Sequence, residues 1–62
     1  MYALLHISGQ YRRAFVGHYP SIPEALKAIP REVLFWDHDV ENDAADAFAA
    51  DGELYAIERE AL

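Results

Sequence analysis

The sequence predicts a small α+β domain in which one helix covers one face of an antiparallel or mixed sheet. Three observations predict this class: a pair of strand-like segments joined by Gly9-Gln10, a capped helix pattern after them, and two apolar segments later in the chain. A chain of 62 residues has room for one hydrophobic core, so residues 1–62 are expected to form a single domain. The expected order is hairpin, helix, strand, short helix or strand, and strand.

Residues 2–8 and 11–19 are rich in strand formers, and Gly9-Gln10 between them suits a two-residue type II′ turn. This register pairs Ser8 with Tyr11 and sorts the side chains onto two faces. The face expected beneath the helix holds Ala3, Leu5, Ile7, Ala14 and Val16. The face expected to be half exposed supplies a candidate interaction surface, which consists of Tyr2, Leu4, Arg13, Phe15 and Tyr19.

A helix is predicted over residues 21–29. Ser21 and Glu24 have the spacing of a capping box, and Pro23 falls in the first turn, where its missing N–H costs nothing. Pro30 ends the helix. The apolar stripe includes Ile22, Leu26 and Ile29, and these are expected to pack on Leu5, Ile7 and Val16.

The second half of the chain contains two further strands and one ambiguous segment. Residues 33–38 are predicted to be a buried strand, and residues 54–59 another strand. Residues 43–50 contain strong helix formers with acids near their start, which suits a short helix. However, Asp51-Gly52 ahead of a strand is a hairpin signal, which makes residues 46–50 a possible strand. Both alternatives stay open at this point.

The net charge of −6 is unevenly distributed. Residues 1–31 carry four Lys and Arg residues against Glu24, whereas residues 32–62 carry ten acids against Arg59. Such a field disfavours nucleic-acid phosphates and anionic membranes and favours basic partners.

No motif for catalysis, cofactor binding or metal binding is present in the sequence. The acids at 37, 39, 41 and 43 would fit the first ligand positions of an EF-hand loop, but Phe48 stands where the bidentate Glu is required. The three histidines lack metal-ligand spacing, and the glycines form no phosphate-binding pattern. A small hydrolase or metal enzyme would need a pocket that gathers His38 with Asp37 or Asp39. We therefore expect no catalytic residues, no cofactor and no metal.

Two families offer resemblances. The Gly-Gln hairpin followed by Glu24-Ala25-Leu26 resembles the front half of HicB-type antitoxins, although that family's extra strand before the helix is missing. The pattern from Ala45-Asp46 through Asp51-Gly52 to Glu58 resembles the tail of small uncharacterised phage and prophage proteins. The second resemblance implies an accessory or host-modulating binder.

The sequence therefore predicts a non-catalytic protein-interaction module that binds a protein partner or itself as a homodimer, without nucleic acid, membrane or metal. The aromatic sheet face is expected to serve as one surface and the acidic second half of the chain as the other. The alternative is an acidic inhibitor that occupies a nucleic-acid-binding site on a partner. The absence of cysteine and of a signal-peptide pattern at the first residues makes the cytoplasm the expected compartment.

Overall fold

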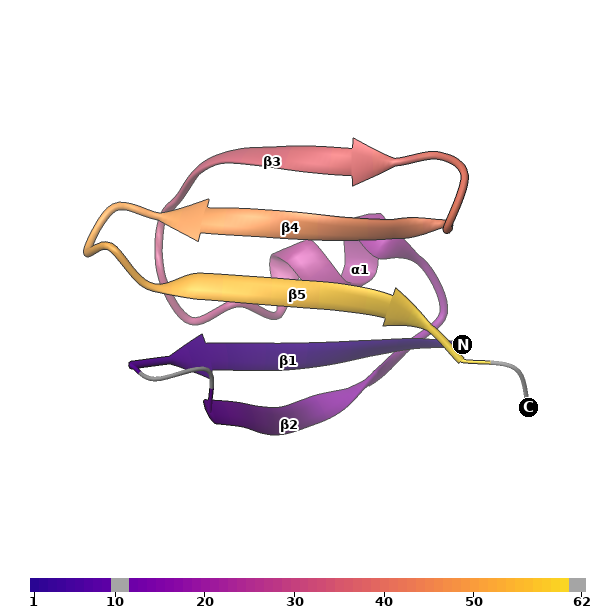
Figure 1. Ribbon diagram of the computed structural model, residues 1–62, viewed down its shortest axis with the longest axis horizontal. Coiled ribbons are helices and arrows are strands. Elements are labelled where there is room, and N and C mark those ends of the chain that lie inside the picture. The colour runs from indigo at the N-terminus through magenta and orange to yellow at the C-terminus, as the bar shows by residue number, and fades with distance from the viewer. Residues whose placement is uncertain (10–11, 61–62) are drawn as a thin grey trace.

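The computed structural model describes residues 1–9 and 12–60. They form a five-stranded sheet and one short helix (Figure 1). The strands are β1 (Tyr2–Ser8), β2 (Arg12–Tyr19), β3 (Val33–Asp39), β4 (Ala44–Ala49) and β5 (Leu54–Arg59), and the helix is α1 (Ile22–Lys27). The order across the sheet is β2-β1-β5-β4-β3, and every neighbouring pair is antiparallel.

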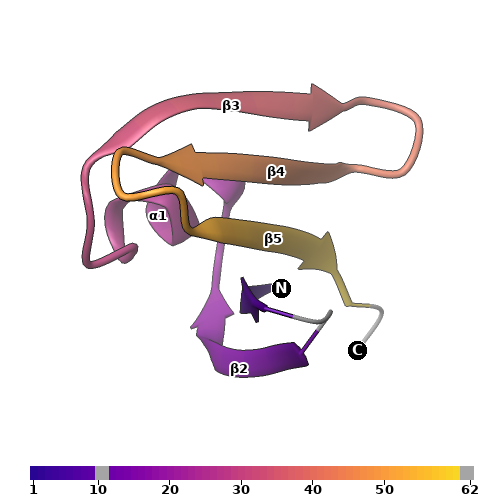
Figure 2. The same cartoon turned by 60° about the vertical axis from the view of Figure 1, so that its left-hand side comes forward.

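The connection through α1 carries the chain from one edge of the sheet to the other. It leaves edge strand β2, crosses a single face of the sheet, and enters edge strand β3 (Figures 1 and 2). Two hairpins then bring β5 back to the middle, where it pairs with β1. No helix in the described part of the chain is long and apolar enough to cross a membrane.

The hydrophobic core lies between α1 and the sheet. The sheet contributes Leu4, Tyr55 and Ile57, which are almost fully buried, and the helix side contributes Ile22, Ala25 and Ile29. Ala45 and Ala47 of β4 are also buried in this cluster. Their small side chains leave room for the helix side of the core to pack close to the strand.

Several predicted elements are confirmed. Ser21 is the N-cap of α1, and its Oγ accepts a hydrogen bond from the Glu24 N–H at 3.2 Å. The helix ends at Lys27, two residues earlier than predicted, and Pro30 follows. The strands predicted over 33–38 and 54–59 are present as β3 and β5.

The ambiguous segment is a strand. Along β4 the buried Ala45, Ala47 and Ala49 alternate with more exposed residues, which is the two-residue period of a strand. Gly52 in the following turn has φ +87°, a conformation that favours glycine. The hairpin signal at Asp51-Gly52 was therefore the better predictor of this segment, and helix propensity misleads because alanine also fits beneath a packed helix.

The fold class is confirmed only in part. The sheet is wholly antiparallel and one face carries a helix, as predicted. The molecule is nevertheless mostly β, because α1 has only six residues and covers only part of that face.

The predicted pairing of the first hairpin is wrong, and with it the assignment of its faces. Ser8 pairs with Arg12 rather than Tyr11, and the predicted turn at Gly9-Gln10 lies partly outside the described residues. A second shift occurs between Leu4 and Leu5, because Leu5 pairs with Phe15 and Leu4 with Gly17, which leaves Val16 as an extra residue. Each one-residue shift exchanges the two faces of β2 relative to β1.

The predicted packing of the helix is wrong as well. The helix lies over Leu4, Tyr55 and Ile57, not over the face of Leu5 and Ile7. The β1 residues that were expected to form the floor beneath the helix lie on the uncovered side of the sheet, whereas Ala14 of β2 lies on the helix side. We call the uncovered side the open face, and its residues alternate with those of the core: Ala3, Leu5, Ile7, Arg13, Phe15, His18, Phe35, Asp37, Asp39, Ala44, Asp46, Phe48, Leu54, Ala56 and Glu58.

Candidate interaction surface

The five residues of the predicted interaction surface do not share one face. Leu4 has no exposed surface and belongs to the core, and Tyr2 and Tyr19 pack against that core. Arg13 and Phe15 lie on the open face instead. The two register shifts separate residues that a regular hairpin would have placed together.

Strand β3 is the most exposed apolar element of the molecule. It was predicted to be buried, but every residue from Leu34 to Asp39 is exposed. Leu34 is 63% exposed, Phe35 58% and Trp36 42%. The reason is its position, because β3 is an edge strand that pairs with β4 alone among the described strands.

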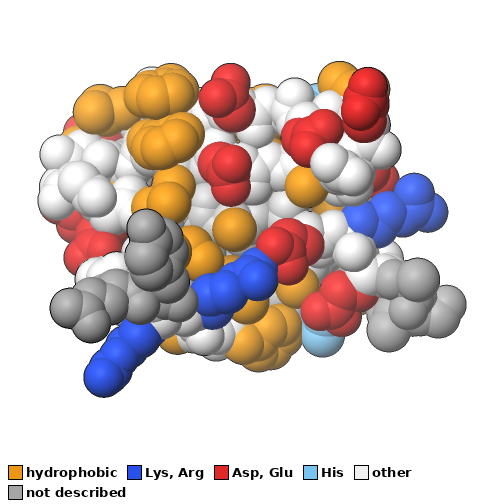
Figure 3. Space-filling view, in the orientation of Figure 1, with side chains coloured by type: hydrophobic (Ala, Val, Ile, Leu, Met, Phe, Trp, Pro, Cys, Tyr) orange, Lys and Arg blue, Asp and Glu red, His pale blue; other side chains and the backbone are white. Residues whose placement is uncertain are grey.

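An apolar band crosses the open face from β3 towards the middle of the sheet. It consists of Phe35, Phe48, Leu54 and Ile7, which pair in that order across four strands. The rings of Phe35 and Phe48 are stacked, with centroids 4.5 Å apart. Figure 3 shows hydrophobic side chains gathered at the upper left, where β3 begins and β4 ends, with acidic side chains beside them. The band ends at Arg13 of β2, which pairs with Ile7.

Two aspartates lie next to the band on the same face. Asp37 pairs directly with Asp46 across β3 and β4, and both are exposed. Like charges directly opposite one another destabilise a sheet. Neither carboxylate has an ion-pair partner within the described residues, so the structure itself offers no compensation for this pair.

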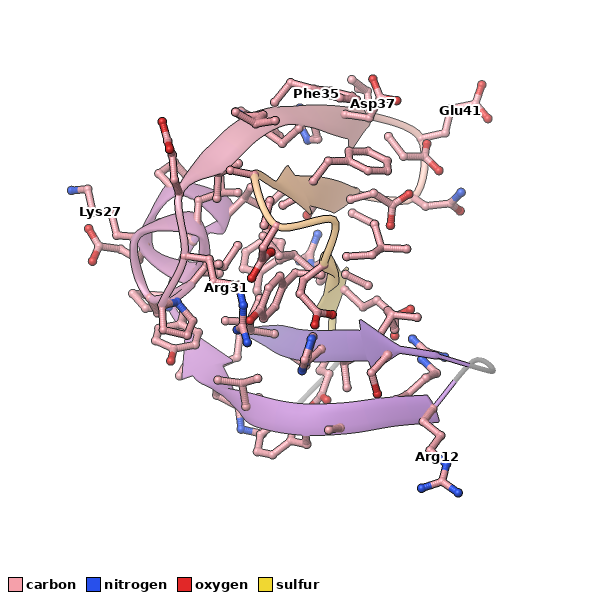
Figure 4. The ribbon with its side chains drawn as sticks, turned by 90° about the vertical axis from the view of Figure 1, so that its left-hand side faces the viewer. Arg12, Lys27, Arg31, Phe35, Asp37 and Glu41 are labelled. Atoms are coloured by element: carbon pink, nitrogen blue, oxygen red, sulfur yellow. The ribbon has the colours of Figure 1, made fainter. Side chains whose placement is uncertain are left out.

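The charge of the molecule is concentrated in the β3–β4 hairpin. We call residues 33–49 the acidic hairpin, because they contain five acids and no Lys or Arg. The remaining residues contain five Lys and Arg against six acids and are therefore nearly neutral. Figure 4 shows Phe35, Asp37 and Glu41 at the β3 end of the molecule, far from Arg12 at the β2 end.

In the rest of the molecule most charged side chains contact a residue of opposite charge or a histidine. Arg13 binds Glu58, and Lys27 lies 3.5 Å from Glu24. His18 and His6 contact Glu60 and Glu53, at 2.7 and 2.9 Å. Among the described residues, only Asp43 of the acidic hairpin joins such a pair, with Arg59 at 3.2 Å.

A second polar cluster lies on the helix side of the sheet. Arg31 points inward, donates to Asp51 at 2.7 Å and to the hydroxyl of Tyr55, and stacks over the Tyr55 ring (Figure 4). The His6 ring also stacks on the Tyr55 ring, and their centroids are 4.7 Å apart. Each of these groups already has a partner, so the cluster connects the loop after α1 to β5 and β1.

The residues that an enzyme would have needed together are kept apart. His38 shares its face with Trp36, whose ring centroid is 5.7 Å away, while Asp37 and Asp39 lie on the open face. Within residues 1–9 and 12–60 no pocket is present, and no three metal-ligating side chains cluster together.

Hydrogen bonds shift the pKa of several groups around these clusters. The Asn42 side chain donates to Asp39 at 2.6 Å and, with the Asn42 N–H, lowers the pKa of Asp39. Tyr2 donates to Asp43 at 2.7 Å, and this bond, with burial and the Asp43 charge, raises the pKa of Tyr2. Burial alone would raise the pKa of Asp51, but the Glu53 N–H and the Arg31 guanidinium together lower it.

The apolar run and the acids of this hairpin were treated as separate features in the sequence, so they were not placed on one surface. Val33-Leu34-Phe35-Trp36 indicated a buried strand, and the acids from Asp37 to Asp43 were weighed only as cation ligands, as a solvated loop and as part of the acidic second half of the chain. A usable signal was present, since Asp37 and Asp39 continue the same strand at alternate positions. A strand that places charges at every second residue cannot be buried on both faces.

Comparison of the chain with protein-family models, with curated proteins and with solved structures finds no match. The resemblances to HicB-type antitoxins and to phage proteins therefore stay predictions.

Proposed function

We propose that this chain is a non-catalytic protein-binding module whose contact surface is the acidic hairpin together with the apolar band. One observation carries the proposal. Of the seven large hydrophobic residues that are exposed in the described part of the chain, four lie between Leu34 and Val40, within the hairpin that holds five acids and no Lys or Arg. Exposed apolar groups and uncompensated acids thus occur at the same place.

In the isolated chain the acidic hairpin has two unfavourable features, exposed apolar surface and like charges that face each other. Contiguous apolar surface on a monomer is a common mark of an interaction site, and aromatic residues are enriched in interface cores. The facing pair Asp37 and Asp46 adds repulsion. A partner that covers Phe35 and brings positive charge beside Asp37 would relieve both costs at once. The cytoplasm remains the proposed compartment, because the chain has no cysteine.

The same surface supports a second candidate, an acidic inhibitor that occupies a nucleic-acid-binding site on its partner. The favouring observation is that four of the five acids of the acidic hairpin have no basic partner in the described structure, namely Asp37, Asp39, Glu41 and Asp46. The two candidates differ in one respect. A partner held at its nucleic-acid site is displaced by added DNA or RNA, whereas a partner held elsewhere is not.

The experiment compares Phe35→Ser with Phe15→Ser. The two phenylalanines are 58% and 57% exposed and lie on opposite edge strands of the same open face, so they are matched in type and exposure. Each variant and the wild type are immobilised, exposed to lysate of the native host, and the retained proteins are quantified by mass spectrometry. We expect a retained protein that Phe15→Ser keeps and Phe35→Ser loses. Equal retention by both variants, or loss only with Phe15→Ser, would contradict the proposal.

A further inference from the structure

We propose that the free edge of β3 takes up an extended, basic segment of the partner protein as a sixth strand. This inference rests on the proposed function and specifies the chemistry of the partner. It is carried by the regularity of the β3 edge, by the side chains that alternate along it, and by the charge of the acidic hairpin.

The outer edge of β3 is regular and uncovered in the described structure. Five consecutive residues, 35–39, pair in unbroken register with β4, and the only irregularity precedes them, between Val33 and Phe35. No described strand lies on the outer side of β3 (Figure 1). The backbone N–H and C=O groups directed away from β4 can therefore form a ladder with an added strand.

The opposite edge of the sheet is different. Strand β2 contains an extra residue at Val16, which interrupts its register, and it begins with Arg12 and Arg13. Bulges and charged residues are devices by which natural proteins keep edge strands from pairing. Strand β3 has no bulge between Phe35 and Asp39, and its charges there are acidic, so they oppose pairing with an acidic or neutral strand but not with a basic one.

The side chains of β3 specify what an added strand would contain. Phe35, Asp37 and Asp39 alternate on the open face, and Trp36 and His38 lie on the other face. Neighbouring strands lie about 4.8 Å apart, so each side chain of an added strand would contact its counterpart on β3. Lys or Arg at every second position would then lie beside Asp37 and Asp39, and apolar residues at the intervening positions would lie beside Trp36.

Electrostatic repulsion disfavours a second copy of this chain as the partner at the β3 edge. Pairing β3 with β3 of a second chain would bring together the five acids of each acidic hairpin, where neither copy has a Lys or Arg. At physiological ionic strength the screening length is about 8 Å, which exceeds the spacing between strands, so this repulsion would not be screened. A basic segment gains attraction at the same positions.

The test uses the whole 62-residue chain, labelled with ¹⁵N, and a short blocked peptide of alternating lysine and valine. One control peptide has glutamate in place of lysine, and a second keeps the lysines but is methylated at its internal peptide nitrogens. We expect the basic peptide to shift the amide signals of residues 35–39 and to slow their hydrogen exchange. The glutamate peptide should not bind. Methylation should weaken binding about tenfold or more, because it removes the ladder while keeping the charge.

A pair of protein variants tests the side-chain contacts. Asp37→Asn should weaken the basic peptide about two- to fivefold, the range for an exposed ion pair. Glu24→Gln removes the same charge from α1, where Glu24 faces Lys27, and should change the affinity less.

Three results would overturn the inference: no binding of the basic peptide, equal binding of the methylated peptide, or signal shifts confined to β2. A dimer of the pure protein whose contact maps to β3 would also overturn it. If the peptide fails while Phe35→Ser still loses a partner that Phe15→Ser keeps, the protein-binding function stands and only the added-strand inference falls.

Discussion

Two halves of the molecule differ in how they bury apolar side chains and pair charges. One half is formed by α1, β1, β2 and β5, and the other by β3 and β4. In the first half, the helix and the central strands bury Leu4 and Ile57 completely, and basic side chains reach across the surface to acids. In the second half, β3 exposes Leu34, Phe35 and Trp36 and leaves Asp37 opposite Asp46. The residues of β3, together with Asp46, therefore do less to stabilise the isolated chain than those of the first half. Such local conflict is expected where residues are retained for a contact.

The largest expected difference between the halves is in the cost of removing a leucine side chain. Leu4→Ala deletes a side chain with no exposed surface, so it should lower the free energy of unfolding by about 2–5 kcal/mol. Leu34→Ala deletes one that is 63% exposed and should change the free energy by less than about 0.5 kcal/mol. Urea denaturation measures both. Similar costs would mean that β3 is supported as firmly as β1, and the contrast would disappear.

Removal of one acidic charge should have a smaller effect on the free energy of unfolding, and the sign of this effect should differ between the halves. Asp46→Asn removes a charge that faces Asp37, so it should raise the free energy of unfolding by up to about 1 kcal/mol. Glu58→Gln removes the partner of Arg13 and should lower the free energy slightly or leave it unchanged, as for other surface ion pairs. Both variants lose one negative charge, so net charge is matched. Destabilisation by Asp46→Asn would show that the aspartate pair is not strained in the free chain.

The smallest expected effect is a loss of stability at low pH. The pKa values of Asp39 and Asp51 are lowered in the folded chain, so below about pH 5 the unfolded chain binds more protons at these groups. Their stabilisation is present at neutral pH and is lost as the pH falls through the folded pKa values. We expect the urea midpoint to fall between pH 6 and pH 3, and to fall less in Asp51→Asn. A midpoint that rises on acidification would indicate that relief of repulsion in the acidic hairpin outweighs these bonds.

The local elements could be predicted from the sequence because their signals are local. The Ser21 cap, Pro30 and the Asp51-Gly52 turn each act within a few residues of themselves. The sorting of the β2 side chains between the two faces could not be predicted in this way. It depends on the pairing of Ser8 with Arg12 and on the extra residue at Val16, and each shift changes the pairing by a single residue. The first shift places Phe15 opposite to the face of Leu4, and the second returns Tyr19 to the face of Leu4.

The exposed character of β3 depends on topology in the same manner. Its apolar run would suit a central strand equally well, and only the return of β5 to the middle of the sheet leaves β3 at the edge. The five residues predicted as the candidate surface therefore included Phe15 and Arg13 of the open face, and the acidic hairpin was expected only as part of the acidic second half of the chain.

Site-specific photo-crosslinking tests most directly whether the acidic hairpin contacts a partner. A photoreactive phenylalanine analogue replaces Phe35 in one variant and Phe15 in the other, two sites of nearly equal exposure, and cells of the native host are irradiated. We expect position 35 to yield an adduct with a different protein and position 15 to yield none with that protein. An adduct at position 15 alone, or an adduct at position 35 with the mass of two 7.0 kDa chains, would contradict the assignment of this surface to a basic partner.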